Sequence, residues 1–175
     1  CATKPEITVR DEDLQAVIRN VPYHPYNTIR QPGSVRVYYH ELRKILVPTF
    51  RDKVIPVAYL RASQHQRWEL LQGLMDSDGC IGSRKAQSSY VSTIKQLAES
   101  VRELLWSLGI KNAMTESPST RYGQPTGETL YTIRFTTFDD QPTSKLHRKI
   151  CRKRERVKET RSCFHYLADI EPLSE

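Results

Sequence analysis

Long apolar runs and paired cysteines are both missing from this sequence. The apolar runs are as short as Ile45-Leu46-Val47, so no segment is predicted to span a bilayer, and residues 1–5 lack the apolar core of a signal peptide. The four cysteines stand too far apart for any C-x-x-C pair, which argues against both a zinc site of that kind and a disulfide framework. We therefore expect a cytoplasmic protein.

The positive charge is concentrated in one segment. The chain has 175 residues, 38% of them hydrophobic and 27% charged, as expected for one globular domain or two small ones. The segment between Thr143 and Arg161 contains nine Lys and Arg residues and two acidic residues. The rest of the chain contains 18 basic and 18 acidic residues. Such a concentration predicts a polyanionic partner, and a solvated basic linker is the alternative.

The order strand, helix, strand, helix recurs along the chain, which predicts an internal duplication, with chance similarity as the alternative. The first copy is expected to lack its leading helix. In the second copy a helix begins near Ser63 and stops at Gly79, where we expect a left-handed glycine. The remaining expected elements are strands at 6–10, 34–39, 89–93 and 129–137, a helix capped by Asp11 and a helix closed by Gly109. A turn-rich stretch is expected at Pro25, Asn27 and Pro32-Gly33, and a loop at Pro118, Gly123, Pro125 and Gly127.

The string from Leu71 to Gly79, LQGLMDSDG, places Asp76 and Asp78 at the carboxyl end of a helix. Carboxylates are unfavourable there unless a cation or a hydrogen-bond donor compensates their charge. A bound magnesium ion would compensate it. Gly73 in the middle of the helix predicts the close approach of a second helix. The alternative is a plain polar turn; an EF-hand is excluded because Cys80 and Ile81 occupy its ligand and glycine positions.

The same string resembles the LAGLIDADG motif of homing endonucleases. Its frame from Tyr59 to Gly79 is similar to the second such motif in endonuclease domains carried inside inteins, and the similarity continues through Leu105–Gly109 and Arg161–Ile170. The resemblance implies an α+β fold of two αββαββα-like repeats, whose antiparallel sheets form a DNA-binding saddle. It also implies a truncated first repeat at 1–62, a second repeat with a basic C-terminal segment at 63–160, and a segment at 161–175 that returns toward a splicing module.

The resemblance implies a site-specific double-stranded DNA endonuclease that hydrolyses phosphodiesters with Mg²⁺ or another divalent cation. Asp78 matches the metal-binding aspartate. Asp76 matches a residue that helps to hold the paired helix ends, and Gly73 and Gly79 belong to the same helix interface. Lys149 is the first candidate for the catalytic lysine, and Lys145 is the second. Since one motif is recognisable, the partner aspartate is expected upstream of Cys1, and self-association through the exposed motif helix is a further expectation.

Residues expected to contact DNA lie on the polar faces of strands, after the motif and in the basic segment. They are Thr8, Arg10, Arg36, Tyr38, Arg84, Lys85, Gln87, Thr132, Arg134, Thr136, Arg148, Arg152 and Lys153. The alternative function is a nucleic-acid-binding module of the same fold that does not cut, such as a regulator or maturase-like protein. Self-splicing is not expected, because the sequence after Cys1 does not resemble an intein's opening block and no His-Asn pair precedes Glu175.

Overall fold

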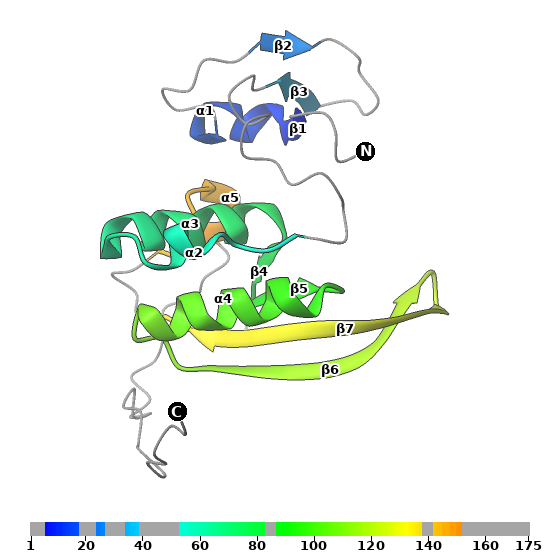
Figure 1. Ribbon diagram of the computed structural model, residues 1–175. Helices are drawn as coiled ribbons and strands as arrows, with labels where there is room; N and C mark the ends of the chain where they lie inside the picture. Colours follow the sequence, from blue (N-terminus) through cyan, green and yellow to red (C-terminus); the bar gives the residue numbers. More distant parts are fainter. Residues whose placement is uncertain are drawn as a thin grey trace.

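The computed structural model describes residues 6–17, 24–26, 34–38, 53–82, 87–137 and 142–151. These residues form an α+β arrangement with two antiparallel sheets, one of three strands and one of four (Figure 1). The expected fold class is thereby confirmed. None of the described helices is both long enough and apolar enough to cross a membrane.

The first sheet is built from three short strands in the order β1-β3-β2. They are β1 (Glu6–Arg10), β2 (His24–Tyr26) and β3 (Ser34–Tyr38). A 3-10 turn, η1 (Asp11–Asp13), and a short helix, α1 (Leu14–Val17), follow β1. The prediction of a turn at Pro25 was wrong, since Pro25 lies in β2, and the rest of that predicted stretch, Asn27 and Pro32-Gly33, lies outside the described residues. An edge strand tolerates the missing N–H of proline, and β2 is at the edge.

The second part of the chain runs from α2 to α5 and contains the αββαββα order expected for one repeat. Its elements are α2 (Val57–Leu60), α3 (Gln64–Ser77), β4 (Gly79–Ile81), β5 (Gln87–Ser92), α4 (Lys95–Ser107), β6 (Asn112–Arg121), β7 (Gln124–Thr136) and α5 (His147–Ile150). The sheet order is β4-β5-β7-β6. Its last three strands repeat the topology of β1-β3-β2, with a helix after the first strand in both, which supports the duplication. The exact domain boundaries stay a prediction.

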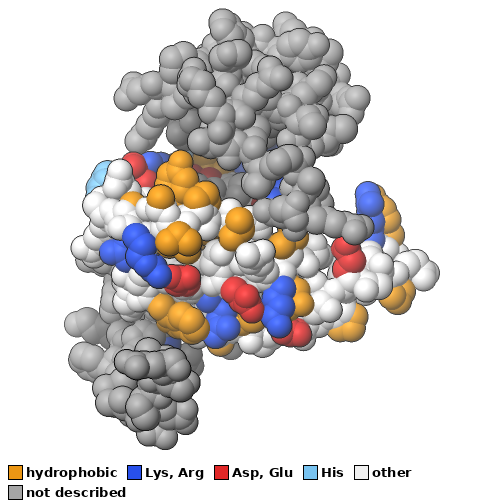
Figure 2. Space-filling model, in the orientation of Figure 1, with side chains coloured by type: hydrophobic (Ala, Val, Ile, Leu, Met, Phe, Trp, Pro, Cys, Tyr) orange, Lys and Arg blue, Asp and Glu red, His pale blue; other side chains and the backbone are white. Residues whose placement is uncertain are grey.

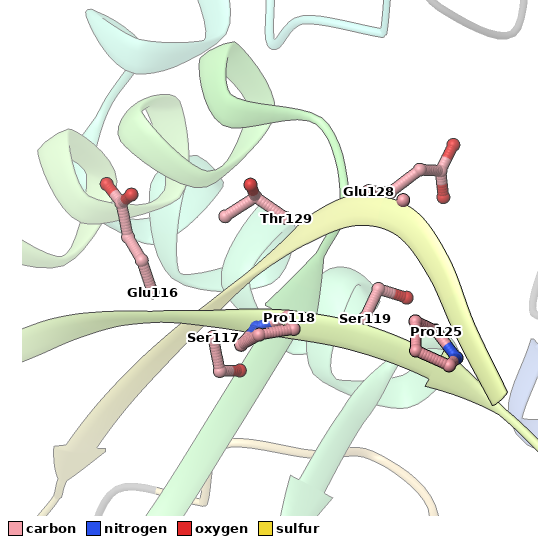
Figure 3. Close-up of a pocket in the computed structure, with 8 residues that line it drawn as sticks. Glu116, Ser117, Pro118, Ser119, Pro125, Glu128 and Thr129 are labelled. Carbon is pink, nitrogen blue, oxygen red and sulfur yellow. The ribbon is translucent and has the colours of Figure 1, made fainter. Parts of the chain in front are cut away.

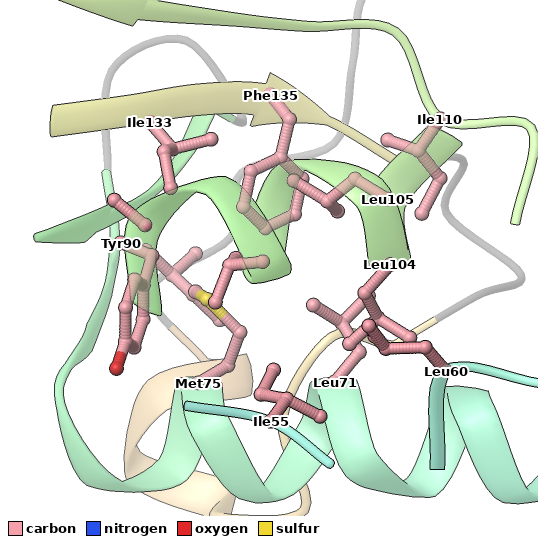
Figure 4. Close-up of a cluster of buried hydrophobic side chains, with 13 residues drawn as sticks. Ile55, Leu60, Leu71, Met75, Tyr90, Leu104, Leu105, Ile110, Ile133 and Phe135 are labelled. Carbon is pink, nitrogen blue, oxygen red and sulfur yellow. The ribbon is translucent and has the colours of Figure 1, made fainter. Parts of the chain in front are cut away.

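A single apolar core holds the second part together. Helix α4 lies along the inner face of the sheet, and α3 packs beside it (Figures 1 and 4). Leu71 and Met75 of α3 are fully buried with Leu104 of α4 and Ile133 of β7. Alternation along β7 explains this arrangement, because Ile133 and Phe135 point to the helices while Arg134 between them points away.

Helix α3 begins as predicted but ends differently. Ser63 is the N-cap and forms a capping box with Gln66, which satisfies two backbone donors. The left-handed glycine expected at Gly79 is wrong: Gly79 begins β4, and Asp78 is the C-cap. Gly79 is required for another reason, since a Cβ there would lie 2.5 Å from Met75 Cα. By contrast, Gly109 after α4 has a φ of +73°, which confirms that prediction.

The expected loop between residues 118 and 127 is instead a long hairpin. Strand β6 runs into β7 through Tyr122 and Gly123, whose φ values of 53° and 79° are those of a tight hairpin turn. Pro118 is tolerated because β6 is an edge strand, and the register shifts between Pro118 and Thr120. A shallow pocket lies along this hairpin (Figure 3). The prolines and glycines therefore mark a bulge and a turn within paired strands.

Candidate metal and nucleic-acid site

Asp78 lies at the carboxyl end of α3, where the helix gives way to β4. Its amide donates to Leu74 O at 3.1 Å, which completes the last turn. Its side chain is exposed, and no described residue makes a hydrogen bond or ion pair with its carboxylate. Burial raises the pKa of the neighbouring Tyr90 to about 12, and the negative charge of Asp78 adds to that effect. Within the described part of the chain, the Asp78 carboxylate is therefore available to bind a cation.

Asp76 is close in sequence but its carboxylate is fully engaged. Ser144 Oγ donates to Asp76 Oδ1 at 2.5 Å, and the amide of Lys145 donates to both carboxylate oxygens at 3.1 and 3.3 Å. These are charge-assisted hydrogen bonds, and the side chain is partly buried. Asp76 thus fixes the segment 142–151 to α3, and the two aspartates of the motif have different tasks.

Lys149 packs against the carboxyl end of α3. Its side chain is buried, and Nζ donates to Met75 O at 2.6 Å, Asp76 O at 2.8 Å and Gly79 O at 2.8 Å. Two of these carbonyls belong to the last turn of the helix, where backbone acceptors lack helical partners. Burial is the largest cause that lowers the pKa of Lys149, followed by the charge of Arg148, and the charges of the nearby aspartates oppose the shift.

The segment 142–151 follows one side of α3 through side chains spaced three and four residues apart. Gln72 Nε2 donates to Pro142 O at 2.8 Å, and Lys145 Nζ pairs with Glu69 Oε1 at 3.0 Å. The hydrogen bond and the charge of Lys145 lower the pKa of Glu69. Sequence reasoning missed Gln72 and Ser144, although the spacing of Glu69, Gln72 and Asp76 along one helix face is a signal that could have indicated them.

The expected second helix against Gly73 is not found among the described residues. A Cβ built at Gly73 meets no heavy atom within 4 Å, and the residue is exposed in the middle of α3. Gly79, at the start of β4, packs against Met75 of α3, and Asp76 contacts residues 144 and 145. A paired-helix role for these three positions stays a prediction.

The outer face of the four-stranded sheet carries the polar residues predicted on β7. Gln87 of β5 pairs with Thr136, Ser89 with Arg134, and the exposed Arg134 donates from Nη1 to Thr115 Oγ1 at 2.9 Å. Thr132 lies on the same face, opposite to the buried Ile133. The predicted division of β7 into an apolar inner face and a polar outer face is therefore found.

The other predicted DNA contacts are placed in different ways. Thr8 and Arg10 are exposed on β1, with Arg10 Nη1 3.4 Å from Glu12 Oε1, whereas Arg148 is bound to Asp13. On the drawn face, basic and acidic side chains are interspersed (Figure 2). The backbone of Arg36 and Tyr38 lies in β3, but their side chains are not described, and four predicted residues lie outside the described ranges: Arg84, Lys85, Arg152 and Lys153.

The described residues supply one of the two carboxylates expected for a magnesium site. No group of three or more His, Cys, Asp or Glu side chains gathers anywhere in the described ranges. Magnesium is commonly bound through one or two carboxylates, with water and phosphate oxygens in the other positions. The free carboxylate of Asp78 meets that need for one protein ligand, so a complete site shared between two helices would take its second carboxylate from outside the described residues.

Comparison with known proteins identifies the family of this chain. Residues 66–161, more than half of the chain, match the profile of the LAGLIDADG-like domain. The chain belongs to the LAGLIDADG-like domain family.

One curated relative is the replicative DNA helicase DnaB of Mycobacterium intracellulare, 36% identical over 124 residues. The match covers 70% of this chain and 21% of the helicase, so the chain spans about a fifth of that relative's length. Solved structures of the homing endonuclease I-DmoI are also similar. A set of mesophilic variants has a TM-score of 0.48 at 15% identity, covering 83% of this chain and 79% of that one. A complex of I-DmoI with DNA and Mn has a TM-score of 0.48 at 17% identity, covering 75% and 72%.

Proposed function

We propose that this chain is part of an intein-borne LAGLIDADG endonuclease that binds double-stranded DNA and hydrolyses its phosphodiesters with a divalent cation. One observation carries the proposal: among the described residues, one aspartate of the motif has a structural partner and the other has none. Asp76 holds residues 144 and 145, while the Asp78 carboxylate stays exposed at the helix end without a described partner. A polar turn with no further function gives no reason for this separation.

The residues divide the work of such a reaction. Asp78 would hold the metal, which polarises the scissile phosphate and activates water when bound. Arg134 and Thr132 lie on the outer face of a sheet that starts one residue after Asp78, and this face is suited to a groove of DNA. A catalytic role of Lys149 or Lys145 would require their ammonium groups to leave their present partners.

The intein setting rests on the helicase relative. A segment similar to this chain makes up about a fifth of a replicative helicase. Unwinding of DNA does not require a LAGLIDADG domain, so we interpret the shared segment as an insertion into a host protein. The cytoplasmic location expected from the sequence fits a protein that meets DNA and its host there.

The proposal is tested by cleavage of a plasmid that carries the helicase gene without the matched segment. The full chain should cut or nick this plasmid when Mg²⁺ is added, and Asp78→Asn should lower the rate at least about 100-fold, as expected for loss of a metal ligand. Glu99→Gln, which removes an exposed acid on α4, is the matched control and should cleave normally. Equal cleavage by wild type and Asp78→Asn would refute the metal role.

A second candidate function is DNA binding without cleavage. The described residues supply one free carboxylate at the motif, and metal-dependent cleavage of this family type is expected to need two. Self-association through the exposed Gly73 face of α3 would bring a second Asp78 and complete the site. A mobility shift with duplex DNA, without cleavage at any protein concentration, would favour the binding function; cleavage that rises with the square of concentration would favour the dimer.

A further inference from the structure

Helix α5 stands between the two sheets of the molecule. It lies next to α3 on the side that faces the first sheet (Figure 1), and it contacts β4. It has four residues, His147–Ile150, so its two central side chains share one rigid turn. Those two side chains, Arg148 and Lys149, bind opposite neighbours.

Arg148 binds η1, the turn that follows the first strand of the three-stranded sheet. Its Nε donates to Asp13 Oδ2 at 2.6 Å, and Glu12 Oε1 lies 3.9 Å from the same nitrogen. The Asp13 side chain is 7% exposed and that of Arg148 is 29% exposed. An ion pair with one member this deeply buried is costly to break by removing either partner, because the other charge is left without compensation.

Lys149 binds the carboxyl end of α3, where Asp78 is the proposed metal ligand. Its three hydrogen bonds reach the carbonyls of Met75, Asp76 and Gly79, which bracket Asp78 in sequence. The backbone on both sides of Asp78 is therefore attached to α5. Since Arg148 and Lys149 are consecutive, a displacement of one displaces the other.

We propose that α5 couples the first sheet to the motif, with Lys149 as a positioning residue for Asp78 and the Arg148–Asp13 pair as its anchor. The proposal rests on the proposed function in assigning the metal to Asp78. DNA bound across the first sheet would then fix, through Asp13 and α5, where the Asp78 carboxylate lies. The part of the basic segment that the structure describes serves this coupling.

The test measures amide hydrogen exchange of the ¹⁵N-labelled full chain without metal or DNA. Lys149→Met removes all three hydrogen bonds of Nζ, and it should speed exchange of the Asp78 amide, now bonded to Leu74 O, by at least about tenfold, the equivalent of one hydrogen bond to a charged group. Asp13→Asn should speed the same amide at least about threefold, although the side chain that it alters binds Arg148 and not α3. Arg148→Gln should act like Asp13→Asn, and Arg148→Lys should recover part of the protection.

The matched control is Arg61→Gln, which breaks an exposed ion pair with Glu103 that also measures 2.6 Å. It should leave the Asp78 amide unchanged. Unchanged exchange at Asp78 in Asp13→Asn, with Lys149→Met still fast, would overturn the coupling. Fast exchange in all core amides of α4 would show global destabilisation; Lys149→Gln, which keeps a donor, then replaces Lys149→Met, and unchanged Asp78 exchange relative to α4 overturns the proposal.

A second readout separates this inference from the proposed function. Mn²⁺ affinity of the full chain is measured by water-proton relaxation. Asp13→Asn should weaken it about two- to fivefold and Asp78→Asn should abolish it, with Arg61→Gln as the unchanged control. If wild type binds no Mn²⁺ while the exchange pattern holds, the metal assignment fails and the coupling stands. If Mn²⁺ binds but Asp13→Asn alters neither readout, the coupling fails alone.

Discussion

The two aspartates of the motif should respond in opposite ways to the same substitution. Asp76→Asn replaces a carboxylate that accepts hydrogen bonds from the Ser144 hydroxyl and the Lys145 amide by a neutral amide. The amide keeps one acceptor and presents an NH₂ group to donors. Loss of charge-assisted hydrogen bonds at a partly buried site should lower the free energy of unfolding by about 1.5–3 kcal/mol.

Asp78→Asn should instead leave stability unchanged or raise it. Its carboxylate has no described partner, and it stands at the negative end of the α3 dipole. Removing a negative charge from such an exposed position is worth about 0.3–1 kcal/mol. The two variants should therefore differ by about 2–4 kcal/mol, although both remove one negative charge within three residues of each other.

Urea unfolding of the full chain, followed by circular dichroism, measures this difference. Equal m-values for both variants and the wild type would show that the midpoints report stability and not a change in the unfolded state. The reasoning is refuted if Asp78→Asn is as destabilising as Asp76→Asn. It is also refuted if Asp76→Asn is neutral, because the segment 142–151 would then not depend on that carboxylate.

Three further outcomes are expected from the same geometry. Gly73→Ala should stabilise the isolated chain by about 0.5–1 kcal/mol in urea unfolding, because a Cβ there meets no described atom within 4 Å; a loss would show that another backbone covers it. Gly79→Ala should destabilise by about 1–3 kcal/mol, since its Cβ would collide with Met75 Cα, and a neutral result would contradict the close packing. Burial raises the pKa of Tyr90 to about 12 in the fold, so its contribution is present below pH 10 and is lost as the pH rises through the folded pKa. Between pH 10 and 12 the free energy of unfolding should fall in the wild type by about 1.4 kcal/mol per pH unit more than in Tyr90→Phe, as measured by urea unfolding, and parallel slopes would contradict the shift.

The periodic elements could be predicted from the sequence because their burial alternates or recurs at helical spacing. Strand β1 and helix α3, with its start near Ser63, follow from such local signals. The hairpin of β6 and β7 could not, because Pro118 and Pro125 indicate a loop unless one knows that the neighbouring side of each is open. Pro118 is open on one side because β6 is the last strand in the sheet order, and Pro125 is open because β5 pairs with β7 only at residues 131–136.

The site was predicted as chemistry but not as contacts. The sequence indicates that two carboxylates at the end of a helix need an answering cation, and Asp78 follows from the motif. Which donor forms a hydrogen bond to which oxygen of the helix end depends on a segment about 70 residues later in the chain. The sequence places Lys149 in a basic stretch whose expected partner is DNA, whereas in the structure its ammonium donates to two carbonyls of α3 and to one of β4. Local patterning cannot distinguish a buried ammonium from an exposed one.

The position of Lys149 resolves the electrostatic difficulty that the motif creates. A helix end already carries partial negative charge, and Asp76 and Asp78 add two carboxylates to it. The ammonium of Lys149 lies beneath the carbonyls and the donors at residues 144 and 145 engage Asp76, so the inner side of this helix end is compensated from within the chain. Asp78 is the carboxylate that receives no such compensation among the described residues. A divalent cation bound on its exposed side would therefore supply the missing charge without displacing any bond that holds the helix end, which is why metal binding and folding of this motif should be separable properties.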